Sequence, residues 1–93
     1  MSTSATGKRL AVATKLEVRG DRIRVTLSDS RELRLSVDDF EFLRNATPAQ
    51  RARGIVDAKG TALWWEELED GISVAGLTGV SETELERFAG LYD

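Results

Sequence analysis

The sequence predicts an α+β fold: a three-stranded antiparallel meander, then short helices, one or two further short strands and a C-terminal helix. Two observations carry this prediction. Apolar and polar residues alternate with period two over residues 11–36, and the spacing changes to three and four in later segments. A length of 93 residues, 41% apolar and 31% charged, is typical of one globular domain.

The meander is predicted from three runs, residues 11–19, 22–28 and 31–36. In the middle run Ile23, Val25 and Leu27 alternate with polar residues, which is typical of a half-buried antiparallel strand. The pairs of runs are separated by Gly20-Asp21 and by the turn at 28–30, whose residue types favour turns.

Two short helices are expected next. Ser36 resembles an N-cap for a helix over residues 37–45, with apolar residues three positions apart. Thr47, Pro48 and Gln50 match a capping box with proline at the first helical position, so a second helix is expected from there to about Arg53.

The C-terminal half is predicted to contain two short strands, Ile55-Val56 and Ala62–Trp65, separated by a turn at 58–60. An acidic loop at 66–70 and an extended apolar piece over 72–77 follow. Ser81 begins a second capping box, and the last helix is expected over 81–92. Its apolar face is formed by Leu85, Phe88, Ala89 and Tyr92.

The chain is expected to be one domain over residues 9–93, preceded by a flexible tail at 1–8 that is rich in Ser, Thr and Ala. No apolar stretch approaches the ~20 residues that span a bilayer, and the N-terminus lacks the apolar core of a secretory signal. We therefore expect a cytoplasmic protein without a membrane partner.

Neither cysteine nor histidine occurs in the chain. A thiolate zinc site and a cysteine nucleophile are thereby excluded, and the commonest general base and metal ligand is missing. The acidic run at 66–70 does not have the spacing of a calcium loop, and a solvated loop is the simpler interpretation. We expect no enzyme, no metal and no cofactor.

Charge is unevenly distributed around the net value of −3. Residues 1–54 have eleven Lys and Arg against seven Asp and Glu, whereas residues 55–93 have two against nine. The predicted meander places Arg19, Arg22, Arg24 and Arg34 on one exposed face, where they could bind phosphates. Glu17 and Glu32 on the same face, and the absence of interleaved aromatic residues, favour a solvated surface with ion pairs instead.

Trp64 and Trp65 are neighbours on a predicted strand, so their side chains point to opposite faces. One is expected to anchor the core, and the other to be partly exposed beside the acidic residues unless the C-terminal helix covers it. An exposed tryptophan is typical of protein-binding surfaces. The candidate protein-binding residues are Trp64, Trp65, Glu66, Glu67, Glu69 and Asp70.

Residues 16–77 resemble a bacterial family, domain of unknown function 2442. The resemblance rests on Leu27-Ser28-Asp29-Ser30, on Phe40 to Leu43 and on two longer motifs. These are Ala-Thr-Pro-Ala-Gln-Arg-Ala at 46–52 and Trp-Glu-Glu-Leu-Glu-Asp-Gly-Ile-Ser-Val-Ala-Gly-Leu at 65–77. Trp64 stands where the family usually has histidine, Gly54 where tryptophan is common and Gly71 where an acidic residue is common.

The resemblance implies a small α+β domain. It also implies a gene context in which some members are fused to a helix-turn-helix domain, and others lie beside a small protein, domain of unknown function 4160, as in toxin–antitoxin modules. We therefore expect a non-catalytic protein-binding module, antitoxin-like or inhibitory toward another small protein. The alternative is a nucleic-acid-associated regulator that uses the arginine face. Homodimerisation stays open, because a meander leaves an unpaired edge strand.

Overall fold

The computed structural model describes residues 9–92, so the predicted tail at 1–8 lies outside the described residues. The first sheet contains β2 (Ala13–Arg19), β3 (Arg22–Leu27) and β4 (Glu32–Ser36) in the antiparallel order β2-β3-β4. The predicted meander is therefore confirmed, with a register shift between Ala13 and Lys15 on β2.

The prediction of a single helix over 37–45 is wrong. This segment forms a 3-10 turn, η1 (Val37–Asp39), and a separate helix, α1 (Glu41–Arg44). Phe40 separates them in an extended conformation, with φ −129° and ψ 110°. This break allows both Val37 and Leu43 to reach the core, where each is almost fully buried.

Helix α2 (Pro48–Arg51) begins at the predicted capping box. The backbone N–H of Gln50 donates to the Thr47 hydroxyl, and the Thr47 N–H donates to the Gln50 side chain at 2.9 Å. Both bonds satisfy N–H groups that a helix start leaves without partners, which explains why this sequence motif starts a helix.

The second sheet is antiparallel in the order β5-β6-β7, formed by β5 (Ile55–Asp57), β6 (Ala62–Trp65) and β7 (Asp70–Ser73). Two 3-10 turns connect its strands, η2 (Ala58–Gly60) and η3 (Glu66–Leu68). The predicted acidic loop is thus an ordered turn, ended by Glu69 in the left-handed conformation with φ 50°.

Helix α3 (Val74–Thr78) occupies the segment predicted to be extended, so that expectation is wrong beyond Ser73. The Ser73 hydroxyl accepts from the Gly76 N–H at 3.2 Å and acts as the N-cap. A helix of only five residues after a serine cap shows little helical periodicity, so the apolar residues at 72–77 were predicted to be extended.

Helix α4 (Glu82–Phe88) begins at Ser81, whose hydroxyl accepts from the Glu84 N–H, as predicted. It ends before the expected residue 92, because Gly90 adopts φ 85° and ends the helix in the left-handed conformation. Of the predicted apolar face of this helix, Leu85 is fully buried, whereas Phe88 and Tyr92 are 53% and 58% exposed.

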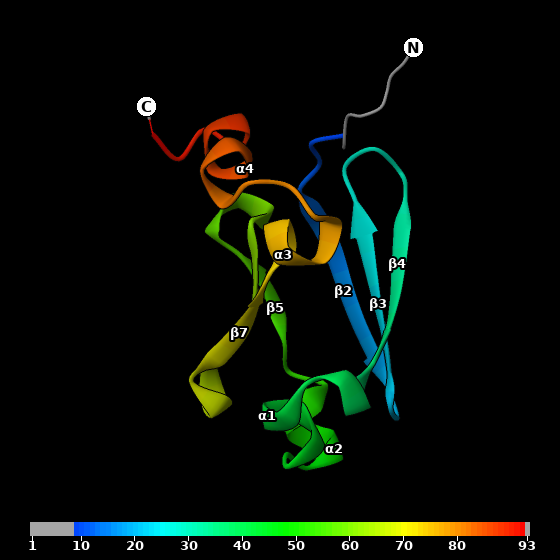
Figure 1. Ribbon diagram of the computed structural model, residues 1–93. Coiled ribbons are helices and arrows are strands. Elements are labelled where there is room, and N and C mark those ends of the chain that lie inside the picture. The colour runs from blue at the N-terminus through cyan, green and yellow to red at the C-terminus, as the bar shows by residue number, and fades with distance from the viewer. Residues whose placement is uncertain (1–8, 93) are drawn as a thin grey trace.

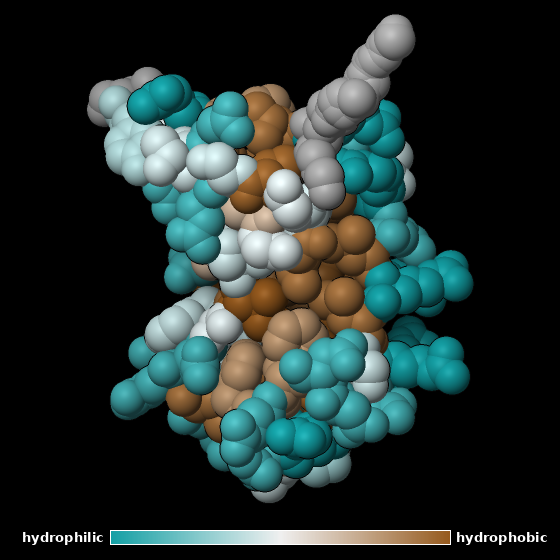
Figure 2. All heavy atoms as spheres, in the orientation of Figure 1, coloured by the Kyte–Doolittle hydropathy of each residue, from teal (hydrophilic) through white to brown (hydrophobic). Residues whose placement is uncertain are grey.

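The core lies between the two sheets, whose inner faces pack against each other, while α1 and α2 close one end and α4 covers the other (Figure 1). The largest fully buried side chains come from both sheets, η1, α1, α3 and α4: Trp65, Ile23, Leu27, Leu43, Leu63, Leu85, Val25, Val37 and Val74. An apolar band between the two sheets remains visible on one face (Figure 2).

None of the helices within residues 9–92 is long and apolar enough to cross a membrane.

Candidate functional site

The outer face of the first sheet carries the four predicted arginines. The strand register sets Arg19 directly opposite Arg22, and Arg24 directly opposite Arg34. Their alternate neighbours Ile23 and Val25 point inward and are buried. We call Arg19, Arg22, Arg24 and Arg34 the arginine face.

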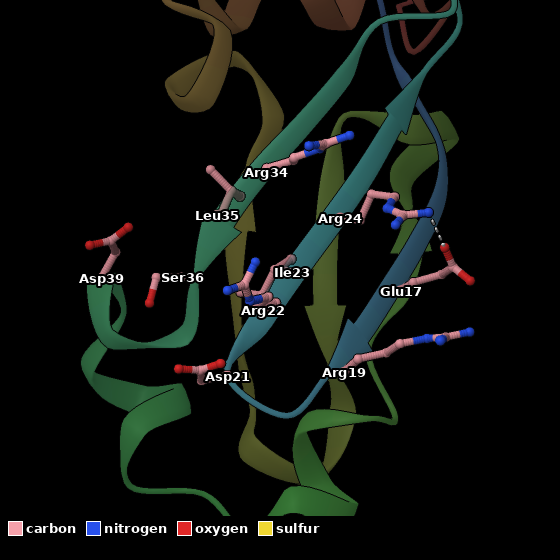
Figure 3. A pocket seen from close by; sticks show the side chains of 10 residues that line it. All are labelled: Glu17, Arg19, Asp21, Arg22, Ile23, Arg24, Arg34, Leu35, Ser36 and Asp39. Carbon is pink, nitrogen blue, oxygen red and sulfur yellow. Dashed lines mark ion pairs between the residues drawn. The ribbon is translucent and has the colours of Figure 1, made fainter.

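Carboxylates neutralise half of the arginine face. Glu17 lies 3.7 Å from the Arg24 guanidinium (Figure 3), and Glu32 lies 3.7 Å from that of Arg34. Within residues 9–92, Arg19 and Arg22 have no carboxylate oxygen within 4.0 Å. The four arginines line a shallow hollow of about 610 Å³ that could accept an anion beside this unneutralised pair.

Trp65 is only 1% exposed and anchors the second sheet from inside. Its indole N–H donates to the Arg51 carbonyl oxygen at 2.9 Å, and Phe42 meets its ring edge-on at a centroid distance of 5.6 Å. A Cβ on Gly54 would lie 2.4 Å from this ring, so glycine leaves the space that the indole fills. Trp65 must therefore be removed from the predicted binding surface, because no partner can reach it.

Trp64 lies on the opposite, outer face of the second sheet, between Ile55 on β5 and Gly71 on β7. The indole N–H donates to a Glu66 carboxylate oxygen at 2.9 Å. A Cβ on Gly71 would lie 2.8 Å from the indole ring, so the ring lies over the glycine. Ile55 is 51% exposed, and this row therefore presents apolar surface to solvent.

A groove of about 420 Å³ separates the outer face of the second sheet from α4 and the residues that follow it. Trp64 and Gly71 form part of one wall, and Leu91 forms part of the other. Carboxylates of Asp70, Glu82 and Glu86 also line it. We define the Trp64 surface as the half-buried tryptophan with its apolar and acidic neighbours: Ile55, Trp64, Glu66, Asp70, Glu86 and Leu91.

The predicted acidic residues do not act as one cluster. Glu66 and Asp70 lie beside Trp64, whereas Glu67 forms an ion pair with Arg53 and accepts from the Gln50 side chain at 3.4 Å. The hydrogen bond from Arg53, helped by that from Gln50, holds the pKa of the Glu67 carboxyl below its ordinary value. The Glu67 carboxylate is therefore already paired with side chains of its own chain. Glu69 is exposed at the turn.

Three residues of the Trp64 surface were missed in the sequence: Ile55, Glu86 and Leu91. Ile55 could have been found, because its position opposite Trp64 follows once the strands at 55–56 and 62–65 are paired. Glu86 and Leu91 approach the sheet only through the tertiary placement of α4, for which the sequence has no local signal.

No group of three or more acidic side chains within residues 9–92 is arranged to hold a metal ion. The same part of the chain has no fully buried polar or charged side chain. The arrangement therefore offers two exposed surfaces of different chemistry, one cationic and one apolar with acidic neighbours.

A family model described as "Protein of unknown function (DUF2442)" matches residues 13–80 of the chain. No curated protein matches the chain. Among solved structures, the chain is similar to a protein of unknown function from Rhodospirillum rubrum, with 21% sequence identity and a TM-score of 0.70. The similarity covers 83% of this chain and 99% of that one, and it shows a shared fold.

Proposed function

We propose that this chain, which belongs to the family described as protein of unknown function (DUF2442), is a non-catalytic protein-binding module. Its partner is another small protein, toward which it acts as an antitoxin-like or inhibitory subunit. The proposal rests on one observation above all: a half-buried tryptophan lies on an open sheet face, beside an exposed isoleucine and an acidic groove.

The Trp64 surface has the composition of a binding hot spot. Tryptophan gives a large apolar contact at little entropic cost, and hot spots are enriched in it. Ile55 extends the apolar contact along the sheet, and Leu91 extends it across the groove. The hydrogen bond to Glu66 already fixes the indole orientation, so the surface is pre-organised for binding.

The charge around this surface indicates a basic partner. Residues 55–93, which contain the whole Trp64 surface, have nine Asp and Glu against two Lys and Arg. A basic partner would be attracted to this half of the molecule and oriented by it, because complementary charges raise association rates and suppress wrong partners.

The test is co-expression of the chain with the protein encoded by the neighbouring gene, followed by purification and measurement of the mass of the complex. A stoichiometric complex is expected, and Trp64→Ala should weaken it at least tenfold, the usual effect at a hot spot. Phe88→Ala is the control, because Phe88 is an exposed aromatic residue that lies outside the Trp64 surface. Absence of a complex, or equal effects of the two variants, would contradict the proposal.

A second candidate function is nucleic-acid binding through the arginine face. The opposed pair Arg19 and Arg22 favours it, since two neighbouring guanidinium groups with no carboxylate oxygen of residues 9–92 within 4.0 Å are suited to phosphate. Asp21 and Asp39 line the same hollow, however, and no aromatic residue lies there for base stacking (Figure 3).

This candidate is tested by measuring nucleic-acid affinity against salt concentration. Each neutralised duplex phosphate contributes about −0.9 to the slope of log affinity against log salt, so Arg19→Ala with Arg22→Ala should reduce the slope by about two. Arg44→Ala is the control, an exposed arginine on α1 away from the arginine face. No detectable binding at low salt would rule this candidate out.

A further inference from the structure

The outer edge of β4 is unpaired along its length within residues 9–92, because β3 is its only strand neighbour. The Leu27 N–H donates to the Arg31 carbonyl oxygen and the Val37 N–H donates to that of Asp21. In an antiparallel ladder the bonding direction alternates. Residues 33 and 35 therefore bond to β3, and the N–H and C=O groups of Glu32, Arg34 and Ser36 point to the free edge.

Edge strands are usually protected by shortness, by charged side chains, by proline, by a bulge or by a covering segment. The two charged side chains on β4, Glu32 and Arg34, are of opposite sign. β4 contains no proline and its register with β3 is regular. The other edge of the first sheet, β2, has a register shift and packs against β5 and β6. The edge of β4 is therefore the one best suited to accept another strand.

The charges on β4 are complementary to a second copy of the same strand. Glu32 and Arg34 project from the outer face of β4. Leu33, which lies between them in the sequence, points to the inner face. In an antiparallel pair with a two-fold axis at Leu33, Glu32 lies opposite the partner's Arg34, and Arg34 lies opposite the partner's Glu32. Both residues present free backbone groups in that register, so each such pair can exchange two hydrogen bonds.

The neighbouring strand gives independent support. Arg24 on β3 lies directly opposite Arg34, and like charges in this position are unfavourable. Glu17 neutralises Arg24 from the β2 side at 3.7 Å. Within residues 9–92 of one chain, Arg34 is paired only with Glu32 of its own strand, also at 3.7 Å. The partner's Glu32 would add a carboxylate directly across the interface and complete a row Glu17, Arg24, Arg34, Glu32.

One alternative register, with the axis at Arg34, is opposed by the same charges. It places Arg34 directly opposite the partner's Arg34, beside two Arg24 side chains, and leaves both Glu32 residues without a cross-strand cation. On the inner face, the favoured register joins the two Leu33 side chains. Leu33 and Leu35 are only partly buried in one chain and pack against the core cluster.

We propose that two copies of this chain associate through antiparallel β4–β4 pairing with the two-fold axis at Leu33, which forms a six-stranded sheet. The partner is a second copy because the edge is complementary to itself in charge and hydrogen bonding. The interface is separate from the Trp64 surface, so the dimer and the heterologous complex can fail independently.

The test is a charge exchange read out by solution mass. The wild-type chain is expected at twice the mass of one chain, dissociating on dilution. Arg34→Glu places two glutamates opposite each other and should weaken the dimer at least tenfold. The double variant Glu32→Arg with Arg34→Glu restores opposite charges in the proposed register and should restore the dimer.

Lys15→Glu is the matched control, because it makes the same change in net charge on the same sheet at the far edge strand. Amide exchange gives a second measurement that does not depend on a variant. The Glu32 and Arg34 amides should be protected at high concentration and lose protection on dilution, while the Leu33 amide stays protected. A monomer at all concentrations, a dimer insensitive to Arg34→Glu, or failure of the double variant to dimerise would each overturn the proposal.

Discussion

The two sheets bury their inner faces in one core but present different chemistry outward. The first has strands of seven, six and five residues whose outer face is charged. The second has strands of three, four and four residues, joined by 3-10 turns, whose outer face carries Ile55, Trp64 and Gly71. The molecule thus combines one cationic surface and one apolar, acidic surface, and these suit different partners.

The sheets also differ in how they are held. The inner face of the first sheet is built from many medium-sized aliphatic side chains, such as Ile23, Val25 and Leu27. The second sheet depends on one large ring, Trp65, which donates to the carbonyl oxygen of the last residue of α2 and packs on Phe42 of α1. A sheet with short strands gains little from its own ladder, so we infer that its stability is concentrated at this contact.

The largest expected effect follows from this dependence. Trp65→Ala should lower the free energy of unfolding by about 3–5 kcal/mol, because it leaves a cavity and an unpaired Arg51 carbonyl oxygen. Trp64→Ala, the neighbouring change on the outer face, should have a much smaller effect. Urea denaturation of both variants measures the difference. Equal losses would show that the second sheet is not anchored from inside.

The next prediction compares glycines from the two sheets. Gly71→Ala should destabilise by about 1–3 kcal/mol, because its Cβ would lie 2.4 Å from the Leu63 carbonyl oxygen and 2.8 Å from the Trp64 ring. Gly20, in the turn of the first sheet, has φ 60° and open space around it. Gly20→Ala should therefore cost only about 1 kcal/mol, from backbone conformation alone. Thermal or urea unfolding of both variants measures the two losses in stability. A larger loss for Gly20→Ala than for Gly71→Ala would contradict the prediction.

These contrasts explain how much the sequence could predict. The first sheet was predictable because strict alternation fixes which side chains share a face, including Arg19, Arg22, Arg24 and Arg34. The second sheet was predicted less completely, because short strands carry little periodicity and Ser73 starts a helix where an extended segment was expected. Neighbouring tryptophans on a strand must point to opposite faces, but the alternation does not say which of them is buried. Trp65 is the buried one because Gly54 leaves space for its ring and α2 accepts its N–H, and both lie outside the strand.

A smaller effect is expected on the outer face of the first sheet. Arg22→Glu places a carboxylate directly opposite Arg19 and should raise the free energy of unfolding by about 0.2–1 kcal/mol. The same change removes half of the unneutralised arginine pair and should weaken binding of any polyanion. Urea denaturation and an anion-binding titration on one sample measure both effects. Destabilisation by Arg22→Glu would mean that the pair is not repulsive in the folded chain.

The smallest effect concerns the turn between β6 and β7. The hydrogen bond from Arg53 lowers the pKa of Glu67 below its ordinary value, so the folded protein holds this carboxylate ionised to lower pH than the unfolded chain does. The stabilisation is therefore complete above the unfolded pKa, near 4.5, and is lost as pH falls through the folded value. Glu67 is exposed and the effect is screened, so only a slight change in acid stability is expected.

In the Glu67→Gln variant, the free energy of unfolding should fall slightly less as the pH is lowered. At neutral pH the variant should lose only the contribution of one surface ion pair. Glu69→Gln is the matched control, since Glu69 is also exposed in the same segment and has no ion pair within residues 9–92. A carboxyl NMR titration locates the effect directly. If the Glu67 carboxyl titrated at its ordinary value, the Arg53 contact would not persist in solution, and Trp65 would be the main link between the second sheet and α2.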